Sequence, residues 1–229
     1  MSEPSSPPPI ECESERRNWV WLSIQTFLRL VFAVCLRYRA HGHEQLQGKR
    51  GTLFLINHQS FLDPMLVGLP LTSPVCFLAR DSLFRVPVIG WILRHTYVLP
   101  INRQAASTGS LREMIARLKA GAWVGIFPEG TRSIDGSLGT LKPGFLALLR
   151  RSEANVCLVG IAGSGHALGR DAWFPRFAKV SVVFGTPISA AEIQTMLANG
   201  DEQFLKLIHD RLAICIHEAE MSIAAKPRK

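Results

Sequence analysis

Beyond residue 42, short runs of β-branched and aromatic residues alternate with stretches in which apolar residues recur at helical spacing. The first pattern is typical of buried strands and the second of helices packed on one side. We expect strands at residues 52–56, 75–79, 97–100, 123–127, 156–161 and 180–184. Helices are expected at residues 64–69, 111–119, 144–151 and 190–220. This alternation of strands and helices predicts an α/β fold.

The N-terminal region has a different pattern. Residues 1–17 are rich in proline, serine and glutamate and have too little apolar surface to order themselves. Residues 19–36 form an apolar run, about 27 Å long as a helix at ~1.5 Å per residue, which is marginal for crossing a bilayer. Gln25 and Arg29 interrupt this run, and no small-residue cleavage site follows it.

Three placements of this run are open: a helix in the membrane interface, a spanning anchor, and a helix packed in a soluble domain. A spanning helix would hold Arg29 near the middle of the bilayer at a cost of about 2.5–3.5 kcal/mol, whereas an interfacial helix keeps the cation near the headgroups. We favour the interfacial helix. The expected organisation is therefore a disordered tail at 1–17, a membrane-associated helix at 18–40 and one domain at 41–225.

The net charge indicates what kind of partner the protein binds, and the cysteines indicate the compartment that it faces. The 229 residues include 26 basic and 18 acidic ones, a net charge of +8, and most of the excess lies in residues 76–151. This excess favours an anionic partner such as a membrane surface or a phosphorylated metabolite. Five scattered cysteines without a C-x-x-C pair are typical of reduced thiols in a cytosol-facing chain. The sequence shows neither a metal-ligand pattern nor a nucleic-acid-binding module, so neither partner is expected.

The first candidate catalytic residues follow the strand expected at 52–56. His58 and Asp63 are separated by four residues, just past this strand and at the start of the next helix. If the chain turns between them, the carboxylate holds one imidazole nitrogen as N–H and leaves the other free as a base. A structural turn in which Asp63 caps the helix has the same spacing, so the spacing alone does not establish catalysis.

A second cluster, Phe-Pro-Glu-Gly-Thr-Arg at 127–132, follows the strand expected at 123–127. Gly130 allows the backbone to approach a ligand, and the planar guanidinium of Arg132 suits phosphate. Arg103 follows a third expected strand. Ligands of α/β proteins collect beyond the carboxyl ends of strands, so the three clusters are expected to converge on one site. Taken alone, each is also compatible with an ordinary loop that carries a surface arginine.

Together these blocks resemble the glycerolipid acyltransferase family, which contains the 1-acyl-glycerol-3-phosphate acyltransferases. Asn57, His58 and Asp63 match the family's Asn-His-x-x-x-x-Asp block, and residues 127–132 match its Phe-Pro-Glu-Gly-Thr-Arg block. The resemblance implies a mixed, mostly parallel sheet flanked by helices, as in glycerol-3-phosphate acyltransferase, with a membrane-associated helix at the N-terminus.

The resemblance runs from about residue 42 to residue 187, and residues 79–103 are similar to the family's second block. Three residues depart from the common pattern at positions where Gly, Asp and Pro are usual, namely His95, Asn102 and Gly160. The second and fourth blocks are associated with acceptor binding in the family. The resemblance favours 1-acyl-glycerol-3-phosphate (lysophosphatidic acid) as acceptor, giving phosphatidic acid, and these departures leave another lysophospholipid or a lyso-aminolipid as alternatives.

The implied reaction moves a fatty acyl group from a thioester, acyl-CoA or acyl carrier protein, to the hydroxyl of a lysophospholipid. His58 would act as general base and Asp63 would fix its tautomer. Substrate binding would fall to Arg103, Glu129, Gly130, Thr131 and Arg132. The two arginines would neutralise the acceptor phosphate, and the other three would shape the loop around it.

The thioester is already activated, so we expect no metal or redox cofactor. The expected location is the cytoplasmic face of a membrane, with the bilayer as a partner.

Several features have a second interpretation. Cys76 and Cys157 lie in apolar runs, where burial disfavours the thiolate, so a core position is favoured over an acyl-carrying nucleophile. Residues 83–93 could line an acyl tunnel, dip into lipid or pack as a short core helix. Lys142 is either a third cation beside the site or a solvent-exposed lysine. A non-catalytic lipid-binding protein and a thioesterase that activates water are the rival functions, and the retained His–Asp pair argues against the first.

Overall fold

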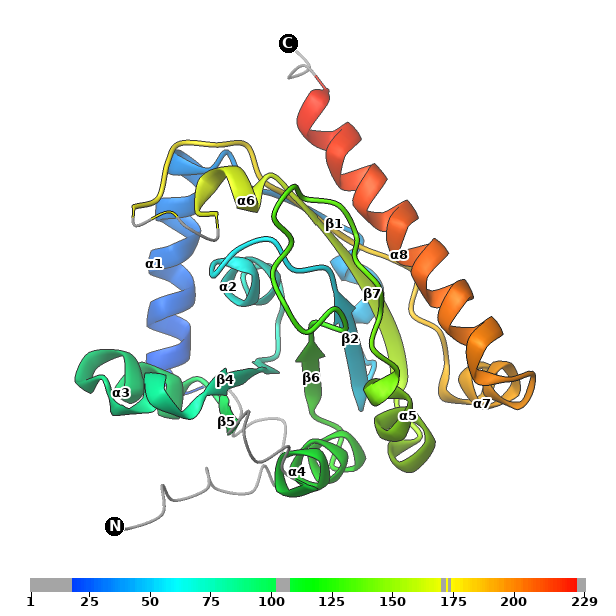
Figure 1. The fold of residues 1–229 in the computed structure, drawn as a ribbon. Helices are drawn as coiled ribbons and strands as arrows, with labels where there is room; N and C mark the ends of the chain where they lie inside the picture. Colours follow the sequence, from blue (N-terminus) through cyan, green and yellow to red (C-terminus); the bar gives the residue numbers. More distant parts are fainter. Residues whose placement is uncertain (1–17, 102–107, 170–171, 173, 226–229) are drawn as a thin grey trace.

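The computed structural model describes residues 18–101, 108–169, 172 and 174–225, and its centre is a six-stranded sheet (Figure 1). The strands lie in the order β1 (Arg39–His41), β8 (Ser181–Phe184), β7 (Asn155–Ala162), β2 (Thr52–Ile56), β6 (Trp123–Ile126) and β3 (Val75–Cys76). Among these strands, β7 and β8 are antiparallel and the other neighbours are parallel. This mixed, mostly parallel sheet confirms the predicted fold class.

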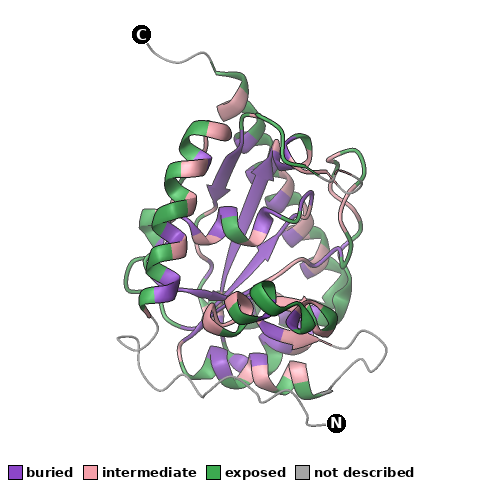
Figure 2. Ribbon diagram, turned by 90° about the vertical axis from the view of Figure 1, so that its left-hand side faces the viewer, coloured by how far each residue is buried: buried purple, intermediate pink, exposed green. Residues whose placement is uncertain are grey.

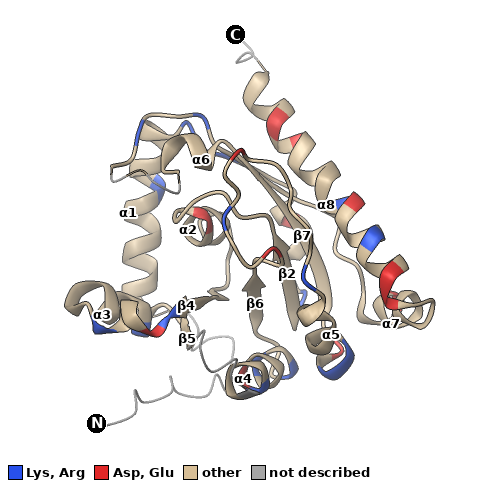
Figure 3. Cartoon of the chain, in the orientation of Figure 1, with Lys and Arg blue, Asp and Glu red and all other residues tan. Residues whose placement is uncertain are grey.

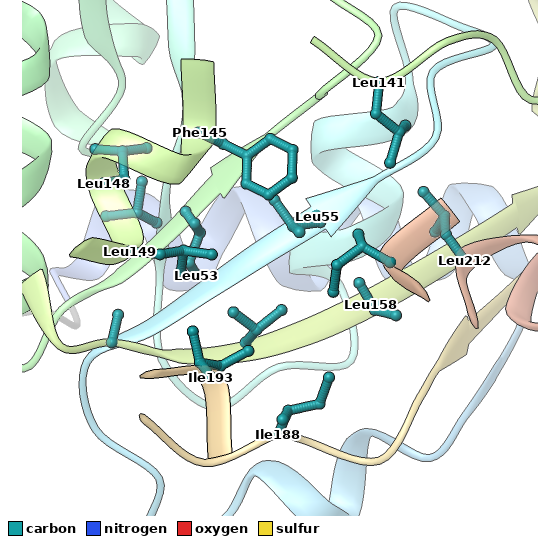
Figure 4. Close-up of a cluster of buried hydrophobic side chains, with 14 of the residues drawn as sticks. Leu53, Leu55, Leu141, Phe145, Leu148, Leu149, Leu158, Ile188, Ile193 and Leu212 are labelled. Carbon is teal, nitrogen blue, oxygen red and sulfur yellow. The ribbon is translucent and has the colours of Figure 1, made fainter. Parts of the chain in front are cut away.

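Helices cover both faces of the sheet (Figure 1). One face packs against α4 (Thr108–Lys119), α5 (Leu146–Ser152), α7 (Ala190–Ala198) and α8 (Asp201–Ala224). The other face packs against α1 (Trp19–Cys35), α2 (Asp63–Gly68) and α6 (Ser164–Ala167). The side chains of β2 alternate between the two cores: Leu53 and Leu55 belong to the core on the first face, and Phe54 to the core on the second. Figure 4 shows Leu53 and Leu55 within the first core, and Figure 2 shows the strands buried between the helical layers.

A smaller sheet pairs β4 (Leu78–Arg80) with β5 (Leu99–Ile101) in parallel. The segment between them forms the 3-10 helix η3 (Asp81–Arg85) and the helix α3 (Pro87–His95); the other 3-10 helices are η2 (His43–Leu46) and η4 (Pro143–Phe145). Helix α3 buries Gly90 but leaves Val88, Ile89 and Trp91 exposed. The interpretation of residues 83–93 as a packed core helix is therefore wrong.

Four of the expected strands agree with the structure, and the two that contribute to the smaller sheet differ from it. The strand at 52–56 is confirmed at both ends, and those at 123–127, 156–161 and 180–184 are confirmed within one residue. The single strand expected at 75–79 is wrong, because the chain leaves the main sheet at Phe77. The Phe77 carbonyl accepts a hydrogen bond from the N–H of Leu99, and β4 pairs with β5 instead of β6. The same pairing moves the strand expected at 97–100 to 99–101.

The helices at 64–69, 111–119 and 144–151 are confirmed with shifted ends, as α2, α4 and α5. The single helix expected at 190–220 is wrong, because it consists of α7 and α8. Gly200 separates them with φ of 110°, a backbone conformation that glycine adopts without steric cost. The capping box of Ser189 and Glu192 starts α7.

Helix α1 confirms the helix expected from the N-terminal apolar run, and it packs on the rest of the chain. Its inner side buries Val20, Trp21 and Phe32, and Phe32 belongs to the core of the second face. Exposed apolar side chains line its outer side, namely Trp19, Leu22, Phe27, Leu30 and Val34. Figure 3 shows α1 almost without charged residues. Within the described ranges, no helix is both long enough and apolar enough to cross a bilayer.

Gly160 makes the contact between β7 and α8 possible, and this contact gives a prediction about stability. A Cβ atom at Gly160 would lie 2.2 Å from the carbonyl carbon of Cys215 in α8. We expect Gly160→Ala to push α8 from the sheet and to lower the free energy of unfolding by about 1–3 kcal/mol, measured by urea unfolding. Gly109→Ala in α4 is the control, because nothing lies within 4 Å of its added Cβ. An unfolding midpoint for Gly160→Ala equal to that of the wild type would contradict the close approach.

Candidate active site

The candidate catalytic pair lies at the carboxyl end of β2, where the chain turns into α2. His58 comes shortly after the strand, and Asp63 is the first residue of the helix. The Nδ1 atom of His58 lies 2.8 Å from Oδ2 of Asp63. Because an ionised carboxylate only accepts hydrogen bonds, this contact assigns the proton to Nδ1 and leaves Nε2 with a free lone pair. The His58 side chain is 18% exposed, so the ring remains accessible.

The carboxylate of Asp63 is fully buried and accepts hydrogen bonds on both oxygens. Oδ2 also accepts from the backbone N–H groups of Gln59, at 2.7 Å, and Ser60, at 2.8 Å. Oδ1 accepts from the hydroxyl of Ser164 at 2.6 Å. These bonds compensate the loss of water around a buried charge and hold the carboxylate in one orientation. The alternative in which Asp63 caps α2 is wrong, since its side chain bonds to the preceding turn.

An aromatic stack supports one face of the His58 ring. The imidazole lies on the ring of Phe127, with centroids 3.9 Å apart and an interplanar angle of 19°. Phe127 lies nearly parallel to Phe77, at 6.0 Å and 18°. Gly125 makes room for this second ring, because a Cβ atom there would lie 2.4 Å from a ring carbon of Phe77. The stack covers one face of the imidazole with apolar atoms and limits its rotation.

The segment 127–133 also holds the backbone of His58. Glu129 is buried, and its Oε1 accepts from the N–H of His58 at 2.9 Å. Its Oε2 accepts from the N–H of Gly139 at 2.9 Å. The N–H of Ser133 donates to the carbonyl of His58 at 2.7 Å. Glu129 therefore ties two loops together, and both of its oxygens are engaged within the protein.

The remaining binding residues expected on this loop lie close by. Arg132 places its guanidinium on the ring of Phe61, with Cζ 3.8 Å from the centroid, a cation–π contact. Gly130 has φ of 71°, and a Cβ atom there would lie 2.7 Å from Nζ of Lys142. The side chain of Lys142 thus lies over this loop and is also exposed, so it fits both interpretations, a third cation beside the site and a solvent-exposed lysine. Thr131 is exposed.

Two of the three expected clusters meet, and the third lies outside the described residues. Strands β2 and β6 are neighbours and parallel, so their carboxyl ends bring residues 57–63 and 127–133 together. Arg103 lies outside the described residues. The strand that precedes it, β5, belongs to the smaller sheet.

Sequence reasoning missed Ser164 and Phe77. Ser164 lies just beyond the carboxyl end of β7, the strand next to β2, and it is fully buried. The sequence does show a serine just after an expected strand, but only the strand order shows that this strand lies next to β2. Phe77 gave no signal beyond that of an ordinary core residue, because its place in the stack depends on the missing side chain of Gly125.

Cys76 and Cys157, the two cysteines weighed as possible nucleophiles, are core residues. Cys76 is 2% exposed and Cys157 is 0% exposed, which confirms the expectation for both. Burial raises the pKa of the Cys157 thiol, and a neutral thiol is a poor nucleophile. Across the described ranges, no group of three or more His, Cys, Asp or Glu side chains is arranged to hold a metal ion.

A family model described as Acyltransferase matches residues 37–162, more than half of the chain, including both loops of the site. The chain belongs to the acyltransferase family. This match spans the elements from β1 to β7 and confirms the resemblance seen in the sequence motifs.

The chain is also similar in sequence to individual acyltransferases. The chain is 31% identical over 153 residues to 1-acyl-sn-glycerol-3-phosphate acyltransferase LPAT1, chloroplastic, of Arabidopsis thaliana. This alignment covers 66% of this chain and 40% of that protein. It is 25% identical over 166 residues to the 1-acyl-sn-glycerol-3-phosphate acyltransferase of Bacillus subtilis, covering 72% of this chain and 80% of that protein. The chain thus spans only about two fifths of the chloroplast relative.

A solved structure shares the fold. The crystal structure of PlsC, the 1-acyl-sn-glycerophosphate acyltransferase of Thermotoga maritima, matches with a TM-score of 0.74. The match covers 91% of this chain and 84% of that chain at 24% sequence identity. This chain and the Thermotoga protein therefore share a fold.

The bridge made by Glu129 gives a prediction about stability. Glu129→Ala leaves the partly buried N–H groups of His58 and Gly139 without their acceptor, so we expect the free energy of unfolding to fall by about 1–3 kcal/mol. Urea unfolding followed by circular dichroism measures the change. Glu218→Ala, which removes an exposed carboxylate of α8, is the control and should change the midpoint much less. Equal losses for both variants would show that the Glu129 bridge adds nothing to stability.

Proposed function

We propose that this chain transfers a fatty acyl group from an acyl thioester to the free hydroxyl of a lysophospholipid. The first acceptor to test is 1-acyl-glycerol-3-phosphate, which would give phosphatidic acid. The observation that carries the proposal is the bond between His58 Nδ1 and Asp63, which leaves Nε2 of an accessible imidazole as a base. Membership of the acyltransferase family and the names of the Arabidopsis and Bacillus relatives support the same reaction.

In the proposed reaction, Nε2 of His58 takes the proton of the acceptor hydroxyl while the hydroxyl oxygen attacks the thioester carbonyl carbon. Asp63 stabilises the imidazolium that forms, through the hydrogen bond to Nδ1. The tetrahedral intermediate then breaks its C–S bond, and the departing thiolate takes the proton from His58. An ester and a free thiol are formed and the protein is unchanged. The donor is acyl-CoA or acyl carrier protein, and the scheme includes no metal or redox cofactor.

The acceptor phosphate needs cations close to the base. Arg132 lies on the loop that holds His58, and its planar guanidinium can bind two phosphate oxygens at once. The proposal assigns Arg132 and Arg103 to the phosphate, with Glu129, Gly130 and Thr131 shaping the loop. Lys142, beside Gly130, adds a further positive charge.

A lipid acceptor places the reaction at a membrane, and the proposal has the bilayer cover the outer sides of α1 and α3. Both helices expose large apolar side chains, among them Trp19, Phe27, Leu30, Val88 and Trp91. The two helices also meet, because Asn18 Nδ2 donates to the carbonyl of His95 at 2.8 Å. Apolar area moved from water into lipid contributes about 25 cal/mol per Å². The division into a tail, a membrane-associated helix and a domain, and the cytoplasmic side, belong to this proposal.

The base gives the first prediction about activity. We expect His58→Ala to lower acyl transfer by about 10²–10⁴-fold, because general-base assistance is lost. Asp63→Asn should cost less, since the base remains but its tautomer is no longer fixed. Both are measured with labelled acyl-CoA and 1-acyl-glycerol-3-phosphate, with products identified by mass. His217→Ala, on the exposed side of α8, is the matched control and should keep full activity.

Three outcomes would contradict this scheme. Near-normal turnover by His58→Ala would end the role of His58 as base. Free fatty acid as the main product would identify a thioesterase instead of a transferase. Wild-type protein that binds lipid but forms no ester with any of several lysolipids would indicate a non-catalytic lipid-binding protein.

Arg132 gives a prediction about the acceptor. Removing a charge-assisted hydrogen bond costs about 1.5–3 kcal/mol, so Arg132→Ala should lower kcat/KM for a phosphorylated acceptor by roughly ten- to a hundredfold. Arg132→Lys should fall between the wild type and Arg132→Ala, because lysine keeps the charge but loses the two-pronged geometry. With a monoacylglycerol as acceptor, the variants should lose much less. Arg151→Ala, an exposed arginine of α5, is the control. Equal losses on both acceptors would refute the assignment to phosphate.

A further inference from the structure

The inner side of α1 carries two polar side chains that contact α2. Gln25 is buried, and its Nε2 lies within hydrogen-bond distance of the carbonyls of Gly68 (3.0 Å), Leu69 (3.1 Å) and Leu71 (2.9 Å). Arg29, one helical turn further along α1, donates from Nε to the carbonyl of Leu69 at 2.8 Å. The two residues that interrupt the apolar run of the sequence therefore point at the same short stretch of backbone.

This stretch is the carboxyl end of α2, where carbonyls lack partners within the helix, together with Leu71 of the loop that follows. The Gln25 amide has two hydrogens for three carbonyls, so at least one hydrogen is shared. A third side chain that follows α1 adds to the set, because the hydroxyl of Tyr38 donates to the carbonyl of Leu66 at 2.7 Å. Leu66, Leu69 and Leu71 are themselves buried. The hydrogen bonds from Gln25 to Leu69 and Leu71 are buried, so losing the Gln25 amide would leave buried carbonyls with fewer donors than they need.

The other end of α2 carries Asp63. The helix has only six residues, about 9 Å at ~1.5 Å per residue, so its two ends are close together and are joined by continuous helical backbone. A shift or tilt at its carboxyl end therefore displaces the Asp63 carboxylate, which bonds to His58 at 2.8 Å. A hydrogen bond weakens steeply with distance and angle, so small movements of α2 change the support of the base.

We infer that Gln25 and Arg29 are positioning residues that act through α2 to hold Asp63 in the geometry that His58 requires. The catalytic part of this inference rests on the proposed function. Helix α1 then has two roles on two sides: its outer side presents apolar residues, and its inner side holds the helix that carries the catalytic carboxylate. Residues 18–36 would thus be part of the active unit as well as an attachment to lipid.

The test uses Gln25→Met, which keeps the length of the side chain and removes its donors. Thr26→Leu is the matched control, because it adds apolar bulk at the next residue of α1, which is exposed. Activity is measured on the full chain in mixed micelles, at temperatures well below the unfolding midpoint of each variant. We expect Gln25→Met to lower kcat by about tenfold with the acceptor KM within about twofold, and Thr26→Leu to change neither.

A double-mutant cycle separates positioning from general destabilisation. In an Asp63→Asn background, Gln25→Met should lower kcat by less than about twofold, because the interaction that it protects is already lost. An equal loss in both backgrounds, or an unchanged kcat in the wild-type background, would overturn the inference. If Gln25→Met does not fold, Arg29→Ala, at an exposed position, enters the same cycle with the same expected non-additivity and a smaller loss.

A spectroscopic measurement tests the inference without relying on activity. The His58 Nδ1–H proton, bonded to Asp63, should give a low-field proton resonance in detergent, identified by its absence in His58→Ala. We expect Gln25→Met to move this resonance upfield or broaden it, and Thr26→Leu to leave it unchanged. A resonance unaffected by Gln25→Met would overturn the inference even if the proposed function holds. A shifted resonance in a protein without acyl transfer would refute the proposed function and keep the positioning role.

Discussion

The buried charge of Asp63 is the constraint on which the rest of the site depends. Removing a carboxylate from water costs several kcal/mol unless hydrogen-bond donors replace the lost solvent. The donors come from the turn at residues 58–60 and from Ser164, about a hundred residues later in the chain. The turn after β2 must therefore lie beside the end of β7. Asn57 secures this arrangement, because its side chain both donates to and accepts from the backbone of Ile161.

Sequence patterns predicted the local features of this protein and left the distant ones open. The strand at 52–56 and the His58–Asp63 pair were accessible, because an apolar run and one turn of chain define them. The contacts of Ser164, Phe77 and Glu129 were not accessible, because they depend on which strands lie side by side. The same reason explains the error at 75–79, where pairing with β5 competes with continuation of β3. Helical periodicity continued across residue 200, so the pattern did not indicate the break that Gly200 makes possible.

The departures from the family pattern have partial explanations in the structure. Gly160 replaces a common proline at a position where the backbone of α8 lies directly on β7, and any Cβ atom there would clash. Gly160 also pairs with Val183 of β8, the antiparallel neighbour of β7. His95 ends α3, where its carbonyl accepts from Asn18 and its ring contacts that of Trp91. These two departures concern packing between elements, and nothing in the contacts of the described residues links them to the acceptor.

Because Glu129 bonds to both, the loop at residues 57–63 and the loop at residues 127–139 hold each other in place. The backbone of His58 is held on its N–H by Glu129 and on its carbonyl by Ser133, and both contacts come from the loop after β6. A change in the length of either loop therefore alters the position of His58. Chimaeric proteins that exchange specificity loops among members of the family would need to transfer residues 57–63 and 127–139 as a pair. Substitutions at side chains that take no part in this bridge, such as Thr131, leave the position of His58 unchanged.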